Sequence, residues 1–416
     1  MKRIKQTITA MAERHQRLRR ILLSCVMIKR KAIYLFYRAR QQKIDENLVV
    51  FEAFGGRSYG CNPKALYQEM QREFAYNNYH YVWCFRKPEK YEFLTKNRNT
   101  DVIKYRSKKY YTCYAKAKYL ITNYRLPQEI RVRKGQVYVQ CWHGVPLKRL
   151  GYDIKEYRDR TVSTRKLRRQ YRKAANDFTY FLSPSQYFTE RITSAFHLKA
   201  LHKENIFIEK GYPRNDTLFQ YSKRDRDLLR EKLGIGARKA ILYCPTYRDN
   251  EYTVGVGNTM TLGIDFHRLQ SELGDDYVLL FRAHYLIKSR FAFEEYGSFI
   301  IDVSEYEEIN ELYMASDLLI TDYSSVMFDY AILEKPIILY MYDLKEYKEN
   351  LRDFYLELNE LMTDPVTSED ELIASIKETE DLGVDERYEQ FNKTHNALNG
   401  PNTSEIILAE IFQHGK

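Results

Sequence analysis

Short apolar runs alternate with helical stretches along most of the chain, and each run predicts a strand. The first half contains six such runs, at residues 48–54, 81–85, 101–105, 119–122, 137–142 and 179–183. The second half contains five, at residues 240–244, 277–282, 299–303, 318–322 and 336–340. Alternation of this kind is typical of a mostly parallel sheet with crossover helices.

The pattern predicts an α/β protein with two doubly wound, Rossmann-like domains that face a cleft. A charged stretch at residues 221–239 separates the two halves, so we place one domain at residues 44–220 and the other at residues 221–416. A chain of 416 residues is long enough for two domains. Ligands of doubly wound sheets bind beyond the carboxyl ends of the strands, and candidate chemistry is therefore expected there.

Residues 1–43 carry the net positive charge of the chain. They contain thirteen Lys or Arg and one acid, a net charge of +12, so residues 44–416 contribute −1 to the total of +11. Their longest uncharged run, residues 21–28, is too short to cross a bilayer, and no signal-peptide cleavage site follows it. Apolar residues recur at spacings near three and four, which predicts a basic amphipathic helix: Leu18, Ile21, Leu22, Cys25, Val26, Ile28, Ile33, Phe36 and Tyr37.

Such a helix can lie in the headgroup layer of an anionic cytoplasmic leaflet, where salt weakens its attachment. Two alternatives stay open: a helix packed on its own domain with a solvated basic face, and a site for nucleic acid or another partner. We do not expect nucleic acid, because residues 44–416 are not basic overall and contain no visible nucleic-acid module.

The six cysteines form no CxxC pair and indicate reduced thiols in the cytosol.

The first candidate for chemistry is His143, which follows the apolar run 137–142 and precedes Gly144 and Pro146. An imidazole that titrates near neutrality can accept a proton from an alcohol. Transfer of an acyl, glycosyl or phosphoryl group to a hydroxyl needs such a base. A lone histidine is also often structural, so both interpretations stay open on spacing alone.

Two further candidates come at the ends of strands in the second half. Arg282 ends the run 277–282 and His284 follows two residues later, and a guanidinium beside an imidazole suits a phosphate or diphosphate. Ser324 and Ser325 follow the run 318–322 and precede a predicted helix that reaches Glu334. A helix N-terminus with hydroxyls can bind an anion, although ordinary capping explains the same residues.

Missing motifs narrow the possible functions. The sequence has no GxGxxG after a strand, no GxxxxGK[ST], no GxSxG and no HExxH. Hydrolysis of nucleotides by a P-loop, serine hydrolysis and zinc proteolysis are therefore disfavoured. His, Cys and carboxylate residues form no cluster at metal-ligand spacing, so we expect neither a tightly held metal nor a cofactor.

Five motifs occur in a fixed order between about Val49 and Tyr355, and together they resemble one family, the CDP-glycerol glycerophosphotransferases of wall teichoic acid synthesis. Five ordered matches are far more specific than any single one. The motifs are Trp142-His143-Gly144 with Pro146-Leu147-Lys148, Gly211-Tyr212-Pro213-Arg214-Asn215-Asp216, Tyr243-Cys244-Pro245-Thr246-Tyr247-Arg248, Arg282-Ala283-His284 and Thr321-Asp322-Tyr323-Ser324-Ser325.

The resemblance implies a GT-B-like fold that uses CDP-glycerol, or CDP-ribitol in some members, as the donor. The acceptor would be an undecaprenyl-linked polymer in the membrane, and the products would be CMP and a phosphodiester-linked glycerol phosphate. Residues 44–220 would bind the acceptor and residues 221–416 the donor. The enzyme would work at the cytoplasmic face of the bacterial cell membrane as a peripheral protein, with residues 1–43 on the anionic surface.

Carried over residue by residue, the resemblance implies that His143 is the base that deprotonates the acceptor hydroxyl. His284, the second catalytic candidate, and Arg282 would hold and neutralise the donor diphosphate, and Ser324 and Ser325 would bind its phosphates. The remaining substrate-binding candidates are Gly144, Lys148, Arg214, Asp216, Asp322 and Asp329, of which the two last receive no individual role.

Several alternatives stay open beside this interpretation. The enzyme could be a primase that adds one unit or a compact polymerase, and its donor could carry glycerol or ribitol. A GT-B glycosyltransferase that uses a nucleotide sugar would have the same architecture. A non-enzymatic scaffold at the membrane surface could bind an anionic polymer through basic segments such as residues 125–173. The sequence predicts no oligomeric state.

Overall fold

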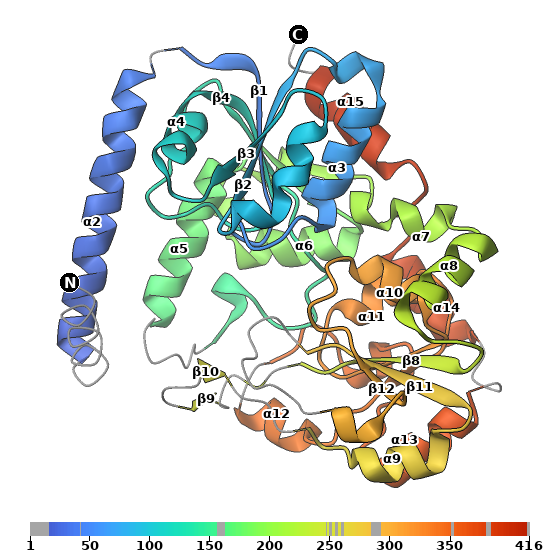
Figure 1. Cartoon of the computed structure of the whole chain (residues 1–416). Coiled ribbons are helices and arrows are strands. Elements are labelled where there is room, and N and C mark those ends of the chain that lie inside the picture. Colours follow the sequence, from blue (N-terminus) through green and yellow to red (C-terminus); the bar gives the residue numbers. More distant parts are fainter. Residues whose placement is uncertain are drawn as a thin grey trace, which may run out of the picture. The chain divides into compact units, whose positions relative to one another are not determined.

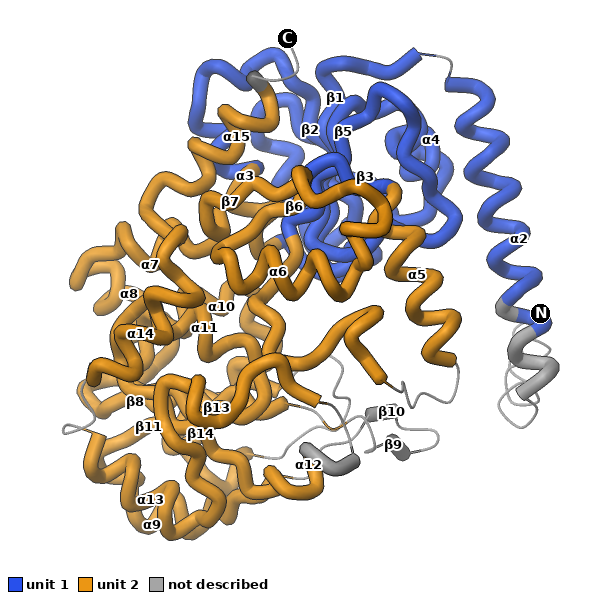
Figure 2. The backbone as a smooth tube through the Cα atoms, turned by 180° about the vertical axis from the view of Figure 1, so that it is seen from behind, with its two compact units in different colours: residues 1–59, 67–141, 177–180 blue, residues 60–66, 142–176, 181–416 orange. Residues whose placement is uncertain are grey.

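The computed structural model describes residues 16–41, 43–155, 163–246, 248, 252–253, 257–258, 262–283, 293–350, 353–379 and 384–413. Contacts divide the chain into two compact units, coloured separately in Figure 2. The first unit comprises residues 1–59, 67–141 and 177–180, and the second comprises residues 60–66, 142–176 and 181–416. The boundaries at residues 43 and 220 that we expect from the sequence stay a prediction.

The first sheet has the strand order β3-β2-β1-β4-β5-β6-β7, and Figure 1 labels its strands β1 to β4. The pairs β1–β2, β1–β4, β2–β3, β4–β5 and β6–β7 are parallel. Its strands are β1 (Asp45–Glu52), β2 (His80–Phe85), β3 (Thr100–Lys104), β4 (Ala117–Thr122), β5 (Val137–Gln140), β6 (Tyr180–Ser183) and β7 (Phe207–Glu209). The α-helices of this part of the chain are α2 (Gln16–Arg40), α3 (Cys61–Arg72), α4 (Lys108–Lys116), α5 (Thr164–Asp177), α6 (Gln186–Ala195) and α7 (Asp216–Gln220).

The second sheet has the order β12-β11-β8-β13-β14, and all its pairings are parallel. Its strands are β8 (Lys239–Cys244), β11 (Tyr277–Phe281), β12 (Ile300–Asp302), β13 (Leu318–Thr321) and β14 (Ile337–Leu339), and a short hairpin joins β9 (Tyr252–Thr253) to β10 (Gly257–Asn258). The helices are α8 (Lys223–Leu233), α9 (Phe266–Leu273), α10 (Ile309–Ala315), α11 (Val326–Ala331), α12 (Leu344–Asn350), α13 (Glu369–Lys377), α14 (Glu386–His395) and α15 (Thr403–Gln413).

Single-turn 3-10 helices complete the secondary structure of the described residues. They are η1 (Phe74–Tyr76), η2 (Pro88–Lys96), η3 (Gly151–Asp153), η4 (Lys199–Leu201), η5 (Glu204–Ile206), η6 (Pro213–Asn215), η7 (Glu294–Tyr296) and η8 (Leu358–Glu360). Of these, η2 is longer because two turns merge across a kink at Tyr91. The turn η6 carries Arg214, and Asp216 follows it directly.

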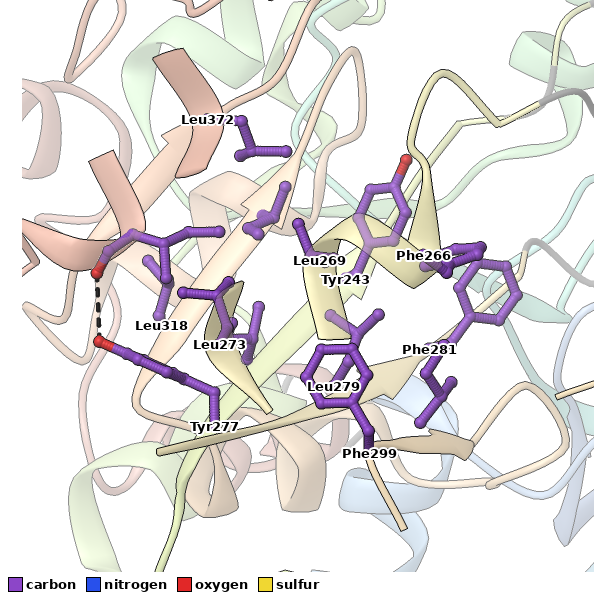
Figure 3. Packing of buried hydrophobic residues seen from close by; sticks show 14 of the residues in the cluster. Tyr243, Phe266, Leu269, Leu273, Tyr277, Leu279, Phe281, Phe299, Leu318 and Leu372 are labelled. Atoms are coloured by element: carbon purple, nitrogen blue, oxygen red, sulfur yellow. Dashed lines mark hydrogen bonds between the residues drawn. The ribbon is translucent and has the colours of Figure 1, made fainter. Parts of the chain in front are cut away.

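A large apolar cluster holds α9 and α13 against the second sheet (Figure 3). Leu279 and Leu318 extend from two of its strands, while Leu269 and Leu372 extend from the two helices, and all four are almost fully buried. Burial of apolar surface on this scale is the main stabilising contribution to a sheet of this kind. The cluster packs against the strands whose carboxyl ends carry the candidate chemistry.

The strand prediction is confirmed, since each of the eleven apolar runs overlaps a strand of one of the two sheets. Strand β7 and the β9–β10 hairpin are too short to produce an apolar run and were not predicted. The predicted strand 137–142 ends earlier, at Gln140, because Trp142 has a φ of 51° and leaves the extended conformation. The helix expected to reach Glu334 ends at Ala331.

Helix α2 packs on α4 through its tyrosines, within the first unit. Tyr34 is fully buried, its hydroxyl donates to the carbonyl of Arg131 at 2.6 Å, and the Tyr37 ring stacks on that of Tyr111 with 6.5 Å between centroids. Among the described residues, no helix is long and apolar enough to cross a membrane. The helix therefore has one face that contacts its own unit, whereas its amphipathic character toward a membrane stays a prediction.

Each sheet has one point where the strand order reverses direction. In the first sheet, β1 is followed by β2 on one side, and the chain returns to add β4 on the other. In the second sheet, β8 lies in the same way between β11 and β13. Connections that leave in opposite directions open a crevice at the carboxyl ends of the two central strands. The switch points of the two sheets lie at β1/β4 and at β8/β13.

Candidate active site

A pocket of about 370 Å³ opens at the β8/β13 crevice of the second unit. Cys244, Pro245 and Thr246 line it where β8 ends, and Tyr323 and Ser324 line it after β13. All the lining residues belong to the second unit. Of the residues predicted from sequence, the pocket brings together His143, Gly144, Lys148, Arg282, Ser324 and Ser325.

His143 reaches the pocket through a sharp change in backbone direction. Trp142 takes the left-handed conformation with a φ of 51°, which is costly for a bulky residue and needs support from its surroundings. The fully buried Asn62 supplies such support, because its side-chain nitrogen donates to the carbonyl of Trp142 at 3.4 Å. The Trp142 indole also stacks on the imidazole of His143, with 4.9 Å between ring centroids. The imidazole is thus held at the pocket wall and remains partly exposed.

The backbone of the His143 loop lies directly against Ser325. A Cβ added at Gly144 would lie 2.6 Å from Oγ of Ser325 and 3.1 Å from its Cβ. Such distances are far shorter than a van der Waals contact, so a side chain at this position would displace Ser325. The glycine therefore allows the base candidate and the serine turn to share one wall of the pocket.

We predict that Gly144→Ala separates His143 from Ser325 and lowers transfer activity at least tenfold, while the protein stays folded. Overpacking of a close contact typically costs about 1–3 kcal/mol, which is enough to move a loop. Gly400→Ala is the matched control, because nothing lies within 4 Å of a Cβ added there. Initial rates and melting temperatures of the two variants check the prediction, and equal rates would contradict the close packing of this wall.

Arg282 lies beyond the end of β11, with its guanidinium oriented by backbone carbonyls. Nη1 donates to the carbonyls of Val303 at 3.1 Å and Tyr306 at 2.7 Å, and the side chain is partly exposed to the pocket. Ser304, which the sequence analysis did not identify, lines the pocket beside it. Held in this way, the cation meets an incoming anion without a large loss of side-chain entropy. His284 lies outside the described residues, and its role stays a prediction.

Ser324 and Ser325 form the turn between β13 and α11. Ser325 occupies the cap position of α11 but makes no capping hydrogen bond, while Oγ of Ser324 accepts weakly from the amide of Val326 at 3.4 Å. The expected capping role is therefore slight. Because α11 has only six residues, its dipole is small, and the hydroxyl groups are the stronger candidates for binding an anion.

Asp322 holds the backbone of two residues that line the pocket, Thr246 and Tyr323. The carboxylate accepts from the amides of Thr246 at 2.9 Å and Tyr323 at 2.6 Å, and it pairs with Nη1 of Arg248 at 2.9 Å. Arg248 also pairs with Asp343 through Nε at 2.6 Å. All these side chains are buried or nearly so, and the network joins the ends of β8 and β13. In this structure Asp322 acts on the pocket through its neighbours and does not line it.

Arg214, Asp216 and Asp329 do not line the pocket either. Arg214 and Asp329 form a buried pair, 2.6 Å between Nη2 and Oδ2, with 6% and 8% of their side chains exposed. Asp216 accepts from the amides at the start of α15, those of Thr403 at 3.2 Å and Ser404 at 2.8 Å. Burial raises the pKa of the Asp216 carboxyl, and these hydrogen bonds act against that rise. The contacts of all three favour positioning roles over direct contact with substrate.

Thr246 is a pocket residue that spacing alone did not single out. Its hydroxyl is buried and has no hydrogen-bond partner among the described residues, and the residue lines the pocket. It lies inside the Tyr243–Arg248 motif, which carried the resemblance but no assigned role. A hydroxyl that is buried without a partner is costly unless a ligand meets it. Thr246 is therefore, like the two serines, a candidate hydrogen-bond donor to a bound phosphate.

No group of three or more His, Cys, Asp or Glu suitable for a metal ion occurs in the part of the chain that the structure describes. The expectation of a metal-free site stays a prediction. The pocket lining includes cations and hydroxyls that can neutralise or hydrogen-bond a phosphate: Lys148, Thr246, Arg282, Ser304, Ser324 and Ser325.

Two parallel sheets, with a cationic, hydroxyl-lined pocket at a switch point, define a GT-B-like α/β transferase as the class of protein. Residues 34–413 match the family model described as "CDP-Glycerol:Poly(glycerophosphate) glycerophosphotransferase". The chain belongs to this family, so the resemblance read from the five motifs is confirmed.

Individual relatives agree with the family assignment. A teichoic acid poly(glycerol phosphate) polymerase of Bacillus spizizenii is 35% identical over 88% of this chain and 92% of its own. A teichoic acid glycerol-phosphate transferase of Staphylococcus aureus is 32% identical over 92% of this chain and 97% of its own. This chain spans about half of another such polymerase, that of Staphylococcus epidermidis, with 38% identity and coverage of 52%.

Among solved structures, the wall teichoic acid polymerase TagF has the same fold. The TM-score is 0.84 at 34% identity, and the match covers 95% of this chain and 96% of that one. A variant of TagF has also been solved after soaking with CDPG. The predicted fold class is confirmed by this match.

Proposed function

We propose that the protein transfers glycerol phosphate from CDP-glycerol to a hydroxyl of an undecaprenyl-linked teichoic acid acceptor and releases CMP. The observation that carries the proposal is the convergence of His143 with Arg282, Ser324 and Ser325 on one pocket. Family membership supports the choice of donor, and the similarity to teichoic acid polymerases supports the class of acceptor.

In the proposed reaction, the acceptor hydroxyl attacks the phosphorus that bears glycerol. A new phosphorus–oxygen bond forms to the acceptor, the bond to the CMP phosphate oxygen breaks, and His143 accepts the hydroxyl proton. Negative charge grows on the leaving phosphate and on the non-bridging oxygens. Arg282 and the hydroxyls of Thr246, Ser324 and Ser325 would stabilise it. Lys148, which lines the pocket, is a further cation for the donor.

A donor screen with product analysis tests this proposal. The full chain is incubated with a lipid acceptor and, in separate reactions, with CDP-glycerol, CDP-ribitol and a set of nucleotide sugars. CMP release with transfer of phosphorus from CDP-glycerol supports the proposal, whereas turnover of CDP-ribitol alone or of a sugar donor replaces it. Binding without any turnover would favour the scaffold alternative. Counting units added per acceptor separates a primase from a polymerase.

We further propose that α2 rests on the anionic cytoplasmic surface of the membrane, where the acceptor is embedded. A stripe of exposed residues runs along the helix, in which neighbours are four, three and seven residues apart from Ile21 to Leu35 and Phe36 follows Leu35 directly: Ile21, Cys25, Ile28, Leu35 and Phe36. Ile28 is 68% exposed and Phe36 is 50% exposed, whereas Tyr34 on the opposite side is buried. Lys29 and Lys31 are exposed beside the stripe. Apolar residues flanked by cations suit an interfacial helix.

We predict that the triple change Ile21→Ser, Ile28→Ser and Phe36→Ser weakens binding to anionic vesicles at least tenfold and leaves transfer to a soluble acceptor unchanged. These substitutions are preferable to deletion of residues 1–43, because deletion removes the buried Tyr34 contact with Arg131. Triple replacement of exposed residues away from α2, at Phe74, Phe219 and Leu228, is the matched control. Equal vesicle binding of both triple variants would show that α2 is not the anchor.

A further inference from the structure

Helix α5, labelled in Figure 2, carries a line of cations opposite its buried residues. Its apolar contacts with the protein recur every four residues, at Leu167, Tyr171 and Ala175, all of them buried. Four basic residues are exposed, and the three arginines among them follow one another at spacings of four and three: Arg165, Lys166, Arg169 and Arg172. Residues at these spacings lie on one face of a helix. From the rise of an α-helix, this line is about 10 Å long.

The four cations lack a counter-charge from the protein. In the part of the chain that the structure describes, none of them forms an ion pair with a carboxylate, and the first turn of α5 contains no acidic residue. Arg165 and Lys166 lie in that turn, where the helix dipole disfavours positive charge. Arg165 and Arg169 are also four residues apart, a spacing at which like charges repel. Without an anion, this face therefore destabilises the helix that carries it.

Helix α8 shows how a basic helix of the same unit is otherwise balanced. Its first turn contains Asp225, which complements the helix dipole. Arg226 and Arg230 both pair with Asp317, the latter at 2.9 Å. Surfaces that need only stay solvated usually intersperse charges of both signs in this way. The unbalanced face of α5 is thus not explained by a general excess of basic residues in this unit.

Helix α5 rests on the segment that follows the pocket wall in the chain. Leu150 lines the pocket, and a Cβ added at the next residue, Gly151, would lie 2.8 Å from Cε1 of Tyr171. Further along, Nη2 of Arg168 donates to the carbonyl of Ile154 at 2.9 Å. All these residues belong to the second unit. The helix is therefore anchored within a few residues of the groups that line the pocket.

We infer that Arg165, Lys166, Arg169 and Arg172 form a binding surface for the phosphodiester chain of the acceptor polymer, outside the reaction pocket. We call it the α5 cationic face. A linear polyanion with one charge in each repeat complements a line of unpaired cations. The inference rests on the proposed function, because that function supplies the polymer.

A polymer suits this face better than a membrane surface does. A helix that lies in a bilayer interface needs exposed apolar side chains beside its cations. None of the large exposed apolar residues of the described chain is on α5, whose apolar residues pack against the protein. The α5 cationic face therefore offers charge alone, which a soluble phosphodiester chain can neutralise.

Equilibrium binding of a labelled, lipid-free glycerol phosphate oligomer to the full chain, at several salt concentrations, tests the inference. One triple variant removes charge and a second keeps it at the same positions: Arg165→Gln/Arg169→Gln/Arg172→Gln and Arg165→Lys/Arg169→Lys/Arg172→Lys. The control removes three exposed charges of the same unit away from α5: Lys210→Gln/Lys223→Gln/Arg224→Gln. Melting temperatures and CDP-glycerol binding show that each variant is folded, and binding to anionic phospholipid vesicles is measured in parallel.

We expect the α5 glutamine variant to bind the oligomer at least tenfold more weakly at low salt. The slope of log affinity against log salt should fall by about 2, since each phosphate contact of a single-stranded chain contributes about 0.7. The lysine variant and the control should stay within about threefold of the unaltered protein. Unchanged oligomer binding in the α5 glutamine variant overturns the inference, and so does an equal loss in the control or in the lysine variant. A loss of vesicle binding alone would assign the face to the membrane and also overturn it.

Turnover separates this inference from the proposed function. The unaltered protein should have a lower KM for a long acceptor than for an acceptor with one glycerol phosphate unit, and the α5 glutamine variant should lose this difference. If oligomer binding depends on the α5 cationic face while CDP-glycerol is not turned over, the surface stands and the proposed reaction fails. If CDP-glycerol is turned over with the same preference for long acceptors in both proteins, the proposed reaction stands and the surface fails.

Discussion

Replacing His143 by Ala is expected to lower the turnover number by about 10²–10⁴-fold, with CDP-glycerol still bound at nearly the same affinity. A general base contributes to the transition state and little to donor binding, because it contacts the acceptor hydroxyl. His143 lines the same pocket as Arg282, Ser324 and Ser325, so removal of the imidazole leaves the anion-binding groups in place. Steady-state kinetics with CDP-glycerol and a soluble acceptor analogue measure the effect.

The control for this prediction is His267→Ala. His267 lies on α9, with 67% of its side chain exposed, and is not among the residues that line the pocket. The His267→Ala variant should keep the turnover number within about twofold of the unaltered protein, as expected for an exposed residue outside the pocket. Near-normal turnover of the His143→Ala variant would remove this residue from the base role.

Breaking the Arg214–Asp329 pair is expected to destabilise the protein by about 3–5 kcal/mol, because the remaining partner becomes an uncompensated buried charge. Burial acts to lower the pKa of Arg214, but the charge of Asp329 outweighs it and holds that pKa above its usual range. Asn215 donates to the other carboxylate oxygen of Asp329 at 3.0 Å. Arg214→Met and Asp329→Asn should therefore each lower the midpoint of chemical denaturation strongly.

The double variant Arg214→Met/Asp329→Leu should recover much of the lost stability, because neither charge then remains buried. An exposed pair provides the control: Lys393 and Glu389 lie 3.6 Å apart with 69% and 55% of their side chains exposed. Glu389→Gln should cost no more than about 0.5 kcal/mol. Equal midpoints for Asp329→Asn and Glu389→Gln would mean that the buried pair does not stabilise the fold.

The Arg214–Asp329 pair links the His143 loop to α11, so loss of this pair should also reduce activity. The amide of Arg214 donates to Oδ1 of Asn62 at 3.2 Å, and Asn62 in turn donates to the carbonyl of Trp142. At its other end, Asp329 lies on α11, which begins just after Ser325. A network of three buried side chains therefore connects two walls of the pocket. This is the physical reason to regard Arg214 and Asp329 as positioning residues.

Much of the fold and part of the site could be predicted from the sequence. Buried strands of a parallel sheet are apolar on both faces, so the eleven runs were visible without any tertiary information. His143, Arg282 and Ser324 could be found because they directly follow such runs, and strand ends meet at one edge of a sheet. The signal in each case is local, carried by residues adjacent in the chain.

The roles of Arg214, Asp329, Asn62 and Thr246 could not be derived in the same way. From sequence alone, a charged residue is expected to be exposed, because burial of its charge requires a partner. The partner of Arg214 is Asp329, which lies 115 residues away in the chain. Asn62 is separated by 80 residues from Trp142, whose carbonyl it holds. Pairings over such distances depend on how the strands are ordered, which apolar spacing does not encode.

By itself, the sequence determined the two sets of strands, the basic N-terminal segment and the family, because each of these depends on the type and order of residues that are close in the chain. Tertiary structure alone decided which switch point carries the pocket and which charged residues are buried in pairs. The reason is physical: strand order sets where a sheet opens, and desolvation of a charge depends on neighbours that only the folded chain brings together.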